Sequence, residues 1–406
     1  MSNNSASAAL PPYSPLVEHF GLDTGRVFLN HGSFGAVPRA VRAKQAQVRT
    51  RLDADPVRFF VEDLEPLLDE ARATMAALVG CPPDDFAFVE NASAAVNTVV
   101  RSLRFEPGDE LLTNTHEYNA CNNVLALAAQ QWGARVVAVP LPFPVHSDDE
   151  IVETIVGAAT GRTRLALVSH ITSPTGIILP VKRIVAALAA RGIDTLVDSA
   201  HAPGFLPLNV ADVGAAYCAG NFHKWLCAPQ KSAFLHVRPD RQHLIHPLVL
   251  SHGFNSKRTD RSKFRLEFDY VGTLDTSPWL AAPDAAAIVG GLVPGGWPQV
   301  MRRNRELALR GRDLLCRELG VAPPAPDHML GAMAVVPLPD RRDGERGVAG
   351  KYPDPLQERL LDRWRVQVPI TPFPAAPARW VRISAHVYNM IEQYEYLAKA
   401  LKAELA

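Results

Sequence analysis

The sequence predicts an α/β protein with a mostly parallel β-sheet that is covered by helices on both faces and followed by a smaller domain. Short apolar runs rich in branched residues alternate with segments whose apolar residues recur at helical spacing. This alternation is typical of parallel sheets with crossover helices. The chain also has 406 residues. One compact core rarely grows past about 250 to 300 residues, so we expect two unequal domains.

Six strand-like runs fall between residues 86 and 220. In chain order they read FAFVEN, ELLTN, ARVVAVPL, TRLALVSHI, IDTLVDSA and AAYCAG. Helix-like segments separate them, among them AAVNTVVRSL, NNVLALAAQQWG and VKRIVAALAARG. We therefore expect a large domain over residues 27–290 whose strands and helices alternate.

The pattern changes near residue 291. A charged helical segment, QVMRRNRELALRGRDLLCREL, leads to the run GAMAVVPL and to a final strand and helix within WVRISAHVYNMIEQYEYLAKAL. We expect these to form a small α+β domain over residues 291–406. The polar insertion 339–355 is interpreted as a solvated loop, with a lid as the alternative. Residues 1–26 are predicted to be an N-terminal arm, and its start, MSNNSASAALPPYSP, is predicted to be mobile.

Composition narrows the class of protein. Acidic and basic side chains balance at 42 each, so no net field favours nucleic acid or an anionic membrane as a partner. The five cysteines include no CxxC pair, which argues against a disulfide framework and a thiolate zinc site and favours a reducing cytoplasm. The chain lacks a signal-like leader and an apolar run of about 20 residues, so we expect a cytoplasmic enzyme.

Two polar residues follow strand-like runs, where ligands bind in open α/β sheets. Asp198 ends the run TLVD, and Lys224 follows AAYCAGNF. Asp198 could be a helix N-cap and Lys224 a surface lysine. Phe222 and Trp225 flank the lysine, however, and burial lowers the pKa of an amine, which leaves a neutral nucleophile able to form an imine.

A possible anion site occurs in VENASAAVNTVVRSL, where a strand gives way to a helix at Ala92 and Ser93. Free amides and the helix dipole favour an anion at such a junction, although Ser93 could be an ordinary cap. A lysine, a carboxylate and an anion site are the parts that pyridoxal phosphate needs. We therefore predict pyridoxal phosphate as the cofactor.

The sequence also resembles a known family. The motifs are LNHGSFGAVP, ENASAAVNTV, HEYNA, SHITSPTGIILP, VDSAHAPG, GNFHKWLCAPQKSAFLH, GTLDTSPWLA and RISAHVYN. From about residue 27 to the end they resemble the class V aminotransferase group of fold-type I pyridoxal-phosphate enzymes, in the branch of isopenicillin N epimerase and the ergothioneine-pathway C–S lyases. Cysteine desulfurases are more distant relatives. The resemblance implies a seven-stranded sheet in the large domain and a homodimer.

The resemblance also implies roles around the cofactor ring. Lys224 corresponds to the lysine that binds the cofactor covalently, and Asp198 to the carboxylate paired with the pyridine nitrogen. His201 and Ser173 correspond to polar groups near the phenolic oxygen. Tyr118 corresponds to the residue that stacks on the ring, with a core tyrosine as the alternative.

Further residues correspond to phosphate ligands. Ala92, through its amide, and Ser93 match the phosphate loop, and Asn221 and His223 match side-chain donors. Thr273 matches a threonine that reaches the phosphate held by the neighbouring subunit, which implies a shared active site. Leu274 stands where this branch often has arginine, so this chain departs from the family pattern at that position.

Three residues correspond to positions near the substrate. Arg382 matches the arginine that clamps the substrate's α-carboxylate, a task suited to a planar fork; a surface arginine on a strand is the alternative. Asn30 and His31 belong to a turn that borders the substrate in relatives. His31 could be an acid or base there, or only a turn residue.

The implied reaction starts at the α-carbon of an amino acid, through an external aldimine. We expect a C–S β-lyase on a cysteine-derived substrate, with an epimerase or racemase and an aminotransferase as alternatives. A desulfurase is disfavoured, because the stretch VQVPITPFPAAPARWVR lacks the nucleophilic cysteine of those relatives, and Cys227 is interpreted as a buried structural thiol.

Two other classes of protein are less favoured. A regulatory or structural module would not need the lysine, the aspartate, the anion site and the arginine together. A metal site is not expected, because the spacing of the strand-end histidines matches no metal motif. These histidines are His116, His170, His201 and His223.

Overall fold

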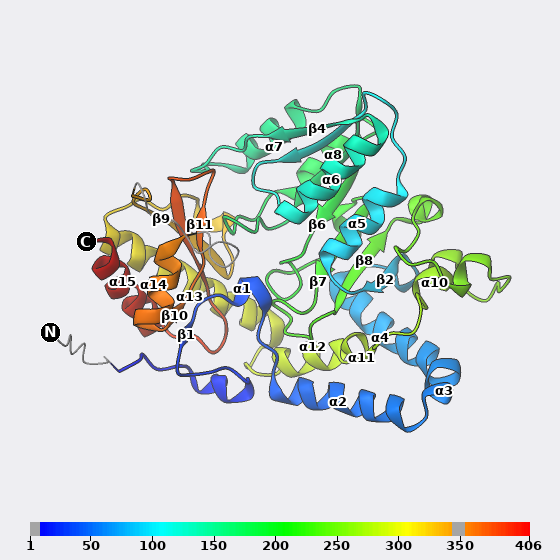
Figure 1. Cartoon of the computed structure of the whole chain (residues 1–406), viewed down its shortest axis with the longest axis horizontal. Coiled ribbons are helices and arrows are strands. Elements are labelled where there is room, and N and C mark those ends of the chain that lie inside the picture. Colours follow the sequence, from blue (N-terminus) through cyan, green and yellow to red (C-terminus); the bar gives the residue numbers. More distant parts are fainter. Residues whose placement is uncertain (1–8, 343–353) are drawn as a thin grey trace.

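The computed structural model describes residues 9–342 and 354–406 (Figure 1). Its centre is a seven-stranded sheet in which β8 alone runs opposite to the other six strands. The predicted mostly parallel sheet is thus confirmed. In spatial order the strands are β2 (Phe86–Val89), β8 (Ala233–Val237), β7 (Tyr217–Asn221), β6 (Asp194–Asp198), β5 (Thr163–Ser169), β3 (Glu110–Asn114) and β4 (Arg135–Val139).

Alternate residues of these strands enter two different hydrophobic cores. On β6, for example, Leu196 packs with helices α5 (Ala92–Ser102) and α6 (Asn119–Trp132), whereas Val197 belongs to the core that includes α8 (Val181–Ala189). Successive side chains of a strand point to opposite faces of a sheet. Helices therefore cover both faces, which explains why the strands read as nearly continuous apolar runs.

Strand β8 was not among the six predicted strand-like runs. It pairs with β7 in antiparallel register, Asn221 opposite Ala233, so the segment 222–232 is a loop held at both ends. The backbone amides of Phe222 and His223 both donate to the carbonyl of Ser232, at 2.9 and 3.2 Å. This closed loop carries Lys224.

The remaining helices of the large sheet's surroundings are α1 (His31–Phe34), α2 (Arg39–Ala54), α3 (Pro56–Arg58), α4 (Leu64–Val79), α7 (Asp148–Gly157), α9 (Val210–Val213), α10 (Lys263–Phe268), α11 (Ser277–Leu280) and α12 (Ala282–Gly290). A π-helical turn, Phe59–Asp63, joins α3 to α4. Short 3-10 turns occur at Pro15–His19, Pro83–Asp85, Pro239–Leu244, His252–Asn255 and Asp327–Met329.

The C-terminal part has its own antiparallel sheet. It consists of β11 (Ile370–Pro372), β12 (Arg379–Ser384) and β9 (Met333–Leu338), with helices α13 (Gly296–Leu319), α14 (Pro355–Trp364) and α15 (Ile391–Leu405). A smaller C-terminal sheet domain is therefore present, as expected. The boundary near residue 291 stays a prediction, and most of the insertion 339–355 lies outside the described residues.

The N-terminal segment packs against this smaller domain. Strand β1 (Val27–Phe28) pairs in parallel with β10 (Val366–Gln367). Phe20 is buried with its ring 5.0 Å from that of Tyr388, and the amide of Ser14 donates to the carbonyl of Tyr388 at 3.0 Å. The prediction of a mobile arm is therefore wrong from Ser14 onward, because the segment buries aromatic surface. Across the described ranges, no helix combines the length and apolarity that crossing a membrane requires.

Candidate active site

Six strands of the large sheet, all except β8, end at the same edge, and the candidate residues at strand ends gather there. Asp198 is the last residue of β6, in register with Ser169 of β5 and Ala219 of β7. Lys224 lies on the loop that follows β7. Parallel strands align their carboxyl ends, so residues far apart in sequence converge at this edge.

Lys224 is half-buried. The pKa of its amine is lowered to about 8, mainly by desolvation; the charge of Asp198 opposes this shift, and that of Arg382 adds to it. The amine is therefore neutral in an appreciable fraction of molecules near neutral pH, the state in which it is nucleophilic.

His201 orients the lysine amine. Its Nε2 lies 3.1 Å from Lys224 Nζ, and its Nδ1 accepts a hydrogen bond from the indole of Trp225 at 3.2 Å. Because an indole only donates, Nδ1 carries no proton and neutral His201 keeps its proton on Nε2. Burial, with Lys224 next, holds the pKa of His201 well below its ordinary value, so His201 donates to a neutral lysine amine.

Asp198 is held without a direct hydrogen bond to the lysine within the described part of the chain. Its Oδ1 accepts the amide of Ala200 at 2.9 Å, and its Oδ2 accepts the thiol of Cys121 at 3.4 Å. Burial raises the pKa of Asp198, while the Ala200 amide and the charge of Lys224 lower it. The carboxylate is thus fixed in place by two donors.

Arg382 is a buried cation in neutral surroundings. Its guanidinium donates to the hydroxyl of Ser33 at 2.8 Å, to Asn30 Oδ1 at 3.4 Å and to the backbone carbonyl of Ser173. Its Nε has no hydrogen-bond partner, and no carboxylate pairs with it among residues 9–342 and 354–406. Burial lowers its pKa to about 10. A buried guanidinium without a counter-ion is suited to bind an anion.

Ser173 and His201 were both predicted near the cofactor's phenolic oxygen, but they lie in different places. Ser173 contacts the guanidinium of Arg382, whereas His201 lies beside the amine of Lys224. Ser33 was not singled out from the sequence, although it lies in the motif LNHGSFGAVP. Its hydroxyl also donates to Asn30 Oδ1 at 2.6 Å. Asn30, Ser33 and Ser173 together surround the guanidinium.

The expected phosphate ligands are only partly free. The amide of Ala92 donates to Asn221 Oδ1 at 2.8 Å, so it is not available to an anion, contrary to our expectation. Asn221 keeps its amide group as a donor. His223 donates from Nδ1 to the carbonyl of Ser232 at 2.9 Å, which leaves its Nε2 open. No hydrogen bond engages the hydroxyl of Ser93 in the described structure.

Three other predicted residues lie on the surface or in a pocket. Tyr118, at the N-cap of α6, is 47% exposed. Thr273 is exposed, and its hydroxyl lies 3.3 Å from that of Tyr270. Leu274 lines an apolar pocket of about 230 Å³ together with Ala94 of the helix that follows Ser93. In the described structure, no hydrogen bond joins any of the three to the amine of Lys224.

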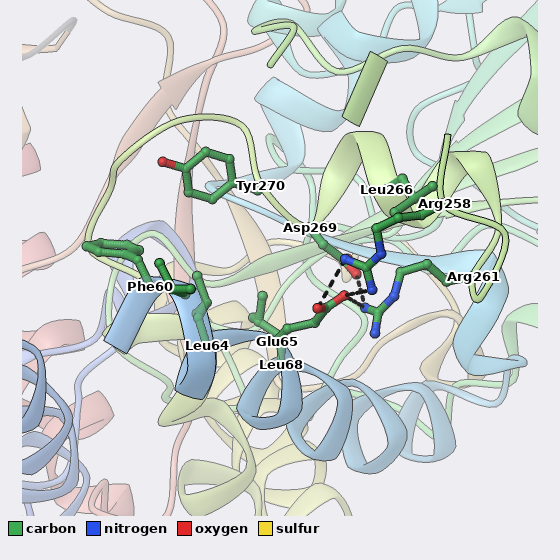
Figure 2. Close-up of a pocket in the computed structure, with 10 residues that line it drawn as sticks. Phe60, Leu64, Glu65, Leu68, Arg258, Arg261, Leu266, Asp269 and Tyr270 are labelled. Atoms are coloured by element: carbon green, nitrogen blue, oxygen red, sulfur yellow. Dashed lines mark hydrogen bonds and ion pairs between the residues drawn. The ribbon is translucent and has the colours of Figure 1, made fainter. Parts of the chain in front are cut away.

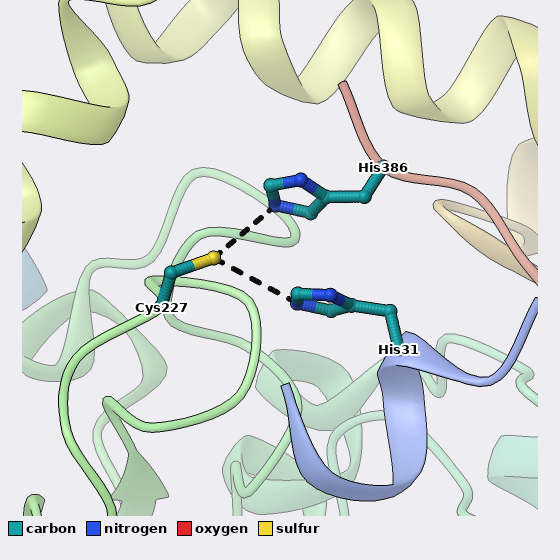
Figure 3. A group of neighbouring side chains, drawn as sticks. All are labelled: His31, Cys227 and His386. Atoms are coloured by element: carbon teal, nitrogen blue, oxygen red, sulfur yellow. Dashed lines mark hydrogen bonds between the residues drawn. The ribbon is translucent and has the colours of Figure 1, made fainter. Parts of the chain in front are cut away.

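His31 is directed beneath the lysine loop. It is fully buried, with Nδ1 2.6 Å from the hydroxyl of Tyr388 and Nε2 3.0 Å from the carbonyl of Lys224. Figure 3 shows the thiol of Cys227 facing the edges of the stacked His31 and His386 rings, with Sγ at 3.8 and 3.5 Å from their Nε2 atoms. Burial raises the pKa of Cys227. Cys227 is a buried thiol, as interpreted from the sequence, and His31 supports the loop.

The strand-end histidines do not share a ligand-like arrangement. Two of them form separate hydrogen bonds, His116 Nδ1 with Thr175 Oγ1 at 2.9 Å and His170 Nδ1 with Ser199 Oγ at 3.2 Å.

Away from the Lys224 site, Figure 2 shows a second pocket, of about 210 Å³. Its charged side chains pair with one another, such as Arg258 with Glu65 at 3.0 Å. That pocket shares no lining residue with the Lys224 site.

Comparisons with known proteins show the family of the chain. Residues 38–288 match the family model described as aminotransferase class-V. Isopenicillin N epimerase of Amycolatopsis lactamdurans is 37% identical over 95% of this chain and 96% of its own length. Putative L-cysteine desulfhydrase 2 of Oryza sativa subsp. japonica is 32% identical over 92% of this chain and 83% of its own.

A more distant relative is the hercynylcysteine sulfoxide lyase of Schizosaccharomyces pombe, 26% identical over 77% of this chain and 81% of its own. Among solved structures, a mutant C-DES with glycine covalently linked to its PLP cofactor has a TM-score of 0.77 at 18% identity, covering 96% of this chain and 99% of that one. The cysteine desulfurase CsdA of Escherichia coli also has a TM-score of 0.77, at 19% identity, over 95% and 96%. The fold is thus that of fold-type I enzymes, and the chain belongs to the class V aminotransferase family of pyridoxal-phosphate enzymes.

Proposed function

We propose that this protein is a pyridoxal-phosphate-dependent C–S β-lyase that acts on a cysteine-derived amino acid. The observation that carries the proposal is a half-buried, partly neutral Lys224 amine, 3.1 Å from His201 and under the electrostatic influence of Asp198 and Arg382. These groups fit a ligand with an aldehyde-bearing ring and a substrate with a carboxylate.

The described residues suit the cofactor. Lys224 would hold it covalently, Asp198 would face the pyridine nitrogen, and His201 would donate from Nε2 to the phenolic oxygen. Tyr118 is exposed enough to stack on the ring. The open hydroxyl of Ser93, the amide group of Asn221 and Nε2 of His223 would hold the phosphate.

The substrate would be oriented by the guanidinium of Arg382, whose Nε has no partner in the described structure. When bound, pyridoxal phosphate supplies an electron sink for the carbon attached to the substrate's amine. Lys224 Nζ would then remove the α-proton. Elimination breaks the bond between Cβ and sulfur, the sulfur leaves as a thiol, and hydrolysis of the remainder gives pyruvate and ammonia.

Relatives named L-cysteine desulfhydrase, 32% and 33% identical, support elimination, as does the relative named hercynylcysteine sulfoxide lyase. An epimerase is the second candidate, because relatives named isopenicillin N epimerase are 37% and 34% identical. An epimerase needs a second proton donor opposite Lys224. His31 is engaged beneath the lysine loop, and the other candidate donor, the phenol of Tyr118, belongs to the residue assigned to ring stacking. This favours the lyase.

We also propose a cytoplasmic homodimer. The exposed hydroxyl of Thr273 is free to reach the cofactor phosphate of a second copy. The five cysteines are unpaired in the structure, in agreement with a reducing compartment.

Product analysis tests the proposal. The purified protein should be yellow, and borohydride should fix the cofactor on Lys224. Incubation with S-substituted cysteines should release pyruvate and ammonia, and Lys224→Ala should abolish the release. Exchange of the α-proton for deuterium without any pyruvate would overturn the lyase and favour the epimerase, and failure to take up the cofactor would overturn both.

A further inference from the structure

A second carboxyl group lies buried beside Asp198. Glu117, in the turn between β3 and α6, is 5% exposed. A carboxylate oxygen of Glu117, one of Asp198 and the Sγ of Cys121 all lie within 4.8 Å of one another. Two carboxylates this close, both out of water, cannot both be charged at neutral pH without a large cost. One proton must therefore stay within the pair.

The two oxygens of Glu117 have different surroundings. Oε1 accepts the hydroxyl of Ser169 at 2.6 Å and the amide of Tyr118 at 2.8 Å. Oε2 is buried and has no hydrogen-bond partner, and no cation pairs with Glu117 in the described part of the chain. A charged oxygen left without a donor in the protein interior is costly. Oε2 is therefore the atom of Glu117 that is suited to carry a proton.

Asp198 has the opposite surroundings. Both of its oxygens accept hydrogen bonds, from the amide of Ala200 and the thiol of Cys121. Lys224 also attracts its charge, since it lowers the pKa of Asp198. The thiol of Cys121 remains protonated and neutral, because burial and both carboxyls raise its pKa. The groups that face the pair thus stabilise a negative charge on Asp198 rather than on Glu117.

We propose that Glu117 is a positioning residue of the cofactor site, which keeps the shared proton on its Oε2 so that Asp198 carries the single negative charge of the pair. This inference rests on the proposed function, because Asp198 is the group that would face the cofactor's pyridine nitrogen. Burial and the charge of Asp198 raise the pKa of Glu117 to about 8, in agreement with a neutral Glu117 at pH 7.

Infrared spectroscopy of the full-length, cofactor-free protein tests the location of the proton. The carbonyl stretch of a buried protonated carboxyl should persist at pH 7 and titrate near pH 8. Glu117→Gln should remove this band. Two further variants keep Glu117 and move the titration in opposite directions. Asp198→Asn removes the like charge and should lower the midpoint, whereas Ser169→Ala removes a hydrogen bond to the charged form and should raise it.

A second arm adds pyridoxal phosphate. A protonated pyridine ring beside Asp198 should lower the midpoint of the Glu117 band by about one pH unit. The proposal is overturned if the wild-type band is absent at pH 7, if it survives in Glu117→Gln, or if bound cofactor leaves its midpoint unchanged. If Glu117→Gln does not fold, the opposite shifts of the band's midpoint in Asp198→Asn and Ser169→Ala test the assignment of the proton to Glu117. A protein that shows the band but takes up no cofactor would contradict the proposed function and leave the proton on Glu117.

Discussion

Replacing Trp225 by phenylalanine tests whether the indole sets the protonation of the lysine. The substitution keeps an aromatic ring but removes the donor to His201 Nδ1, which lies at 3.2 Å. The imidazole is then free to carry its proton on Nδ1 and to accept a hydrogen bond from a protonated Lys224 at Nε2. The variant should therefore stabilise the charged form of the lysine.

The expected magnitude follows from one neutral hydrogen bond, roughly 1 kcal/mol, which corresponds to a rise of about 0.7 in the pKa of the amine. The pKa of Lys224 is about 8 in the native protein. Covalent uptake of pyridoxal phosphate by the cofactor-free chain requires the neutral amine, so at pH 7 its rate should fall roughly fivefold. Visible absorption measured across pH follows this rate.

Trp279 provides a matched control. It is also a buried tryptophan of the large domain, and its indole donates to the carbonyl of Lys231 at 2.9 Å. Trp279→Phe should lower the free energy of unfolding by about 1 kcal/mol, the net contribution of one hydrogen bond, without moving the pH dependence of uptake. Equal pH profiles for native protein and Trp225→Phe would refute the argument.

Three further predictions concern single residues of the site. Arg382→Lys should raise the KM for the amino-acid substrate at least tenfold with a smaller change in kcat, because an ammonium point charge replaces the planar guanidinium fork. The control variant Arg312→Lys, which alters a buried arginine paired with Asp327, should leave KM unchanged. Burial lowers the pKa of His223 to about 4, so its Nε2 must gain a proton before it can donate to the cofactor's phosphate. Cofactor binding should therefore take up a proton, which calorimetry in buffers of different ionisation enthalpy should detect, and His223→Asn should abolish this uptake. His31→Gln should cost roughly 1 to 3 kcal/mol in the free energy of unfolding measured with urea yet leave α-proton exchange stereochemically unchanged, and a change in its stereochemistry would make His31 a proton donor.

The sheet was predictable because both of its faces are covered. Strands such as Thr163–Ser169 and Asp194–Asp198 are buried almost throughout, which gives short apolar runs visible in the sequence. The missing strand, Ala233–Val237, carries His236 within its run and closes a loop instead of starting a crossover. Local patterning alone therefore indicated five parallel strands and the edge strand β2, but not their antiparallel neighbour.

Site residues were predictable where position along a strand determines them. Asp198 and Lys224 follow strands, and the carboxyl edge brings them together. The outcomes at Ala92 and His31 depend on distant partners: Asn221, 129 residues from Ala92, and Tyr388, 357 residues from His31. Glu117 also follows a strand-like run, ELLTN. A carboxyl group after a strand, at the same edge as Asp198, was the sequence signal that could have identified Glu117 as a site residue.

The support beneath the lysine loop has a consequence for how the protein is made. The carbonyl of Lys224 is held by His31, and His31 is held by Tyr388. During synthesis the segment bearing Lys224 emerges long before Tyr388, so the large sheet can form while its central lysine still lacks this anchor. A chain that stops before Tyr388 should therefore fold part of its sheet and still lack a properly held amine, and competence to bind the cofactor should arise only once the last twenty or so residues have docked.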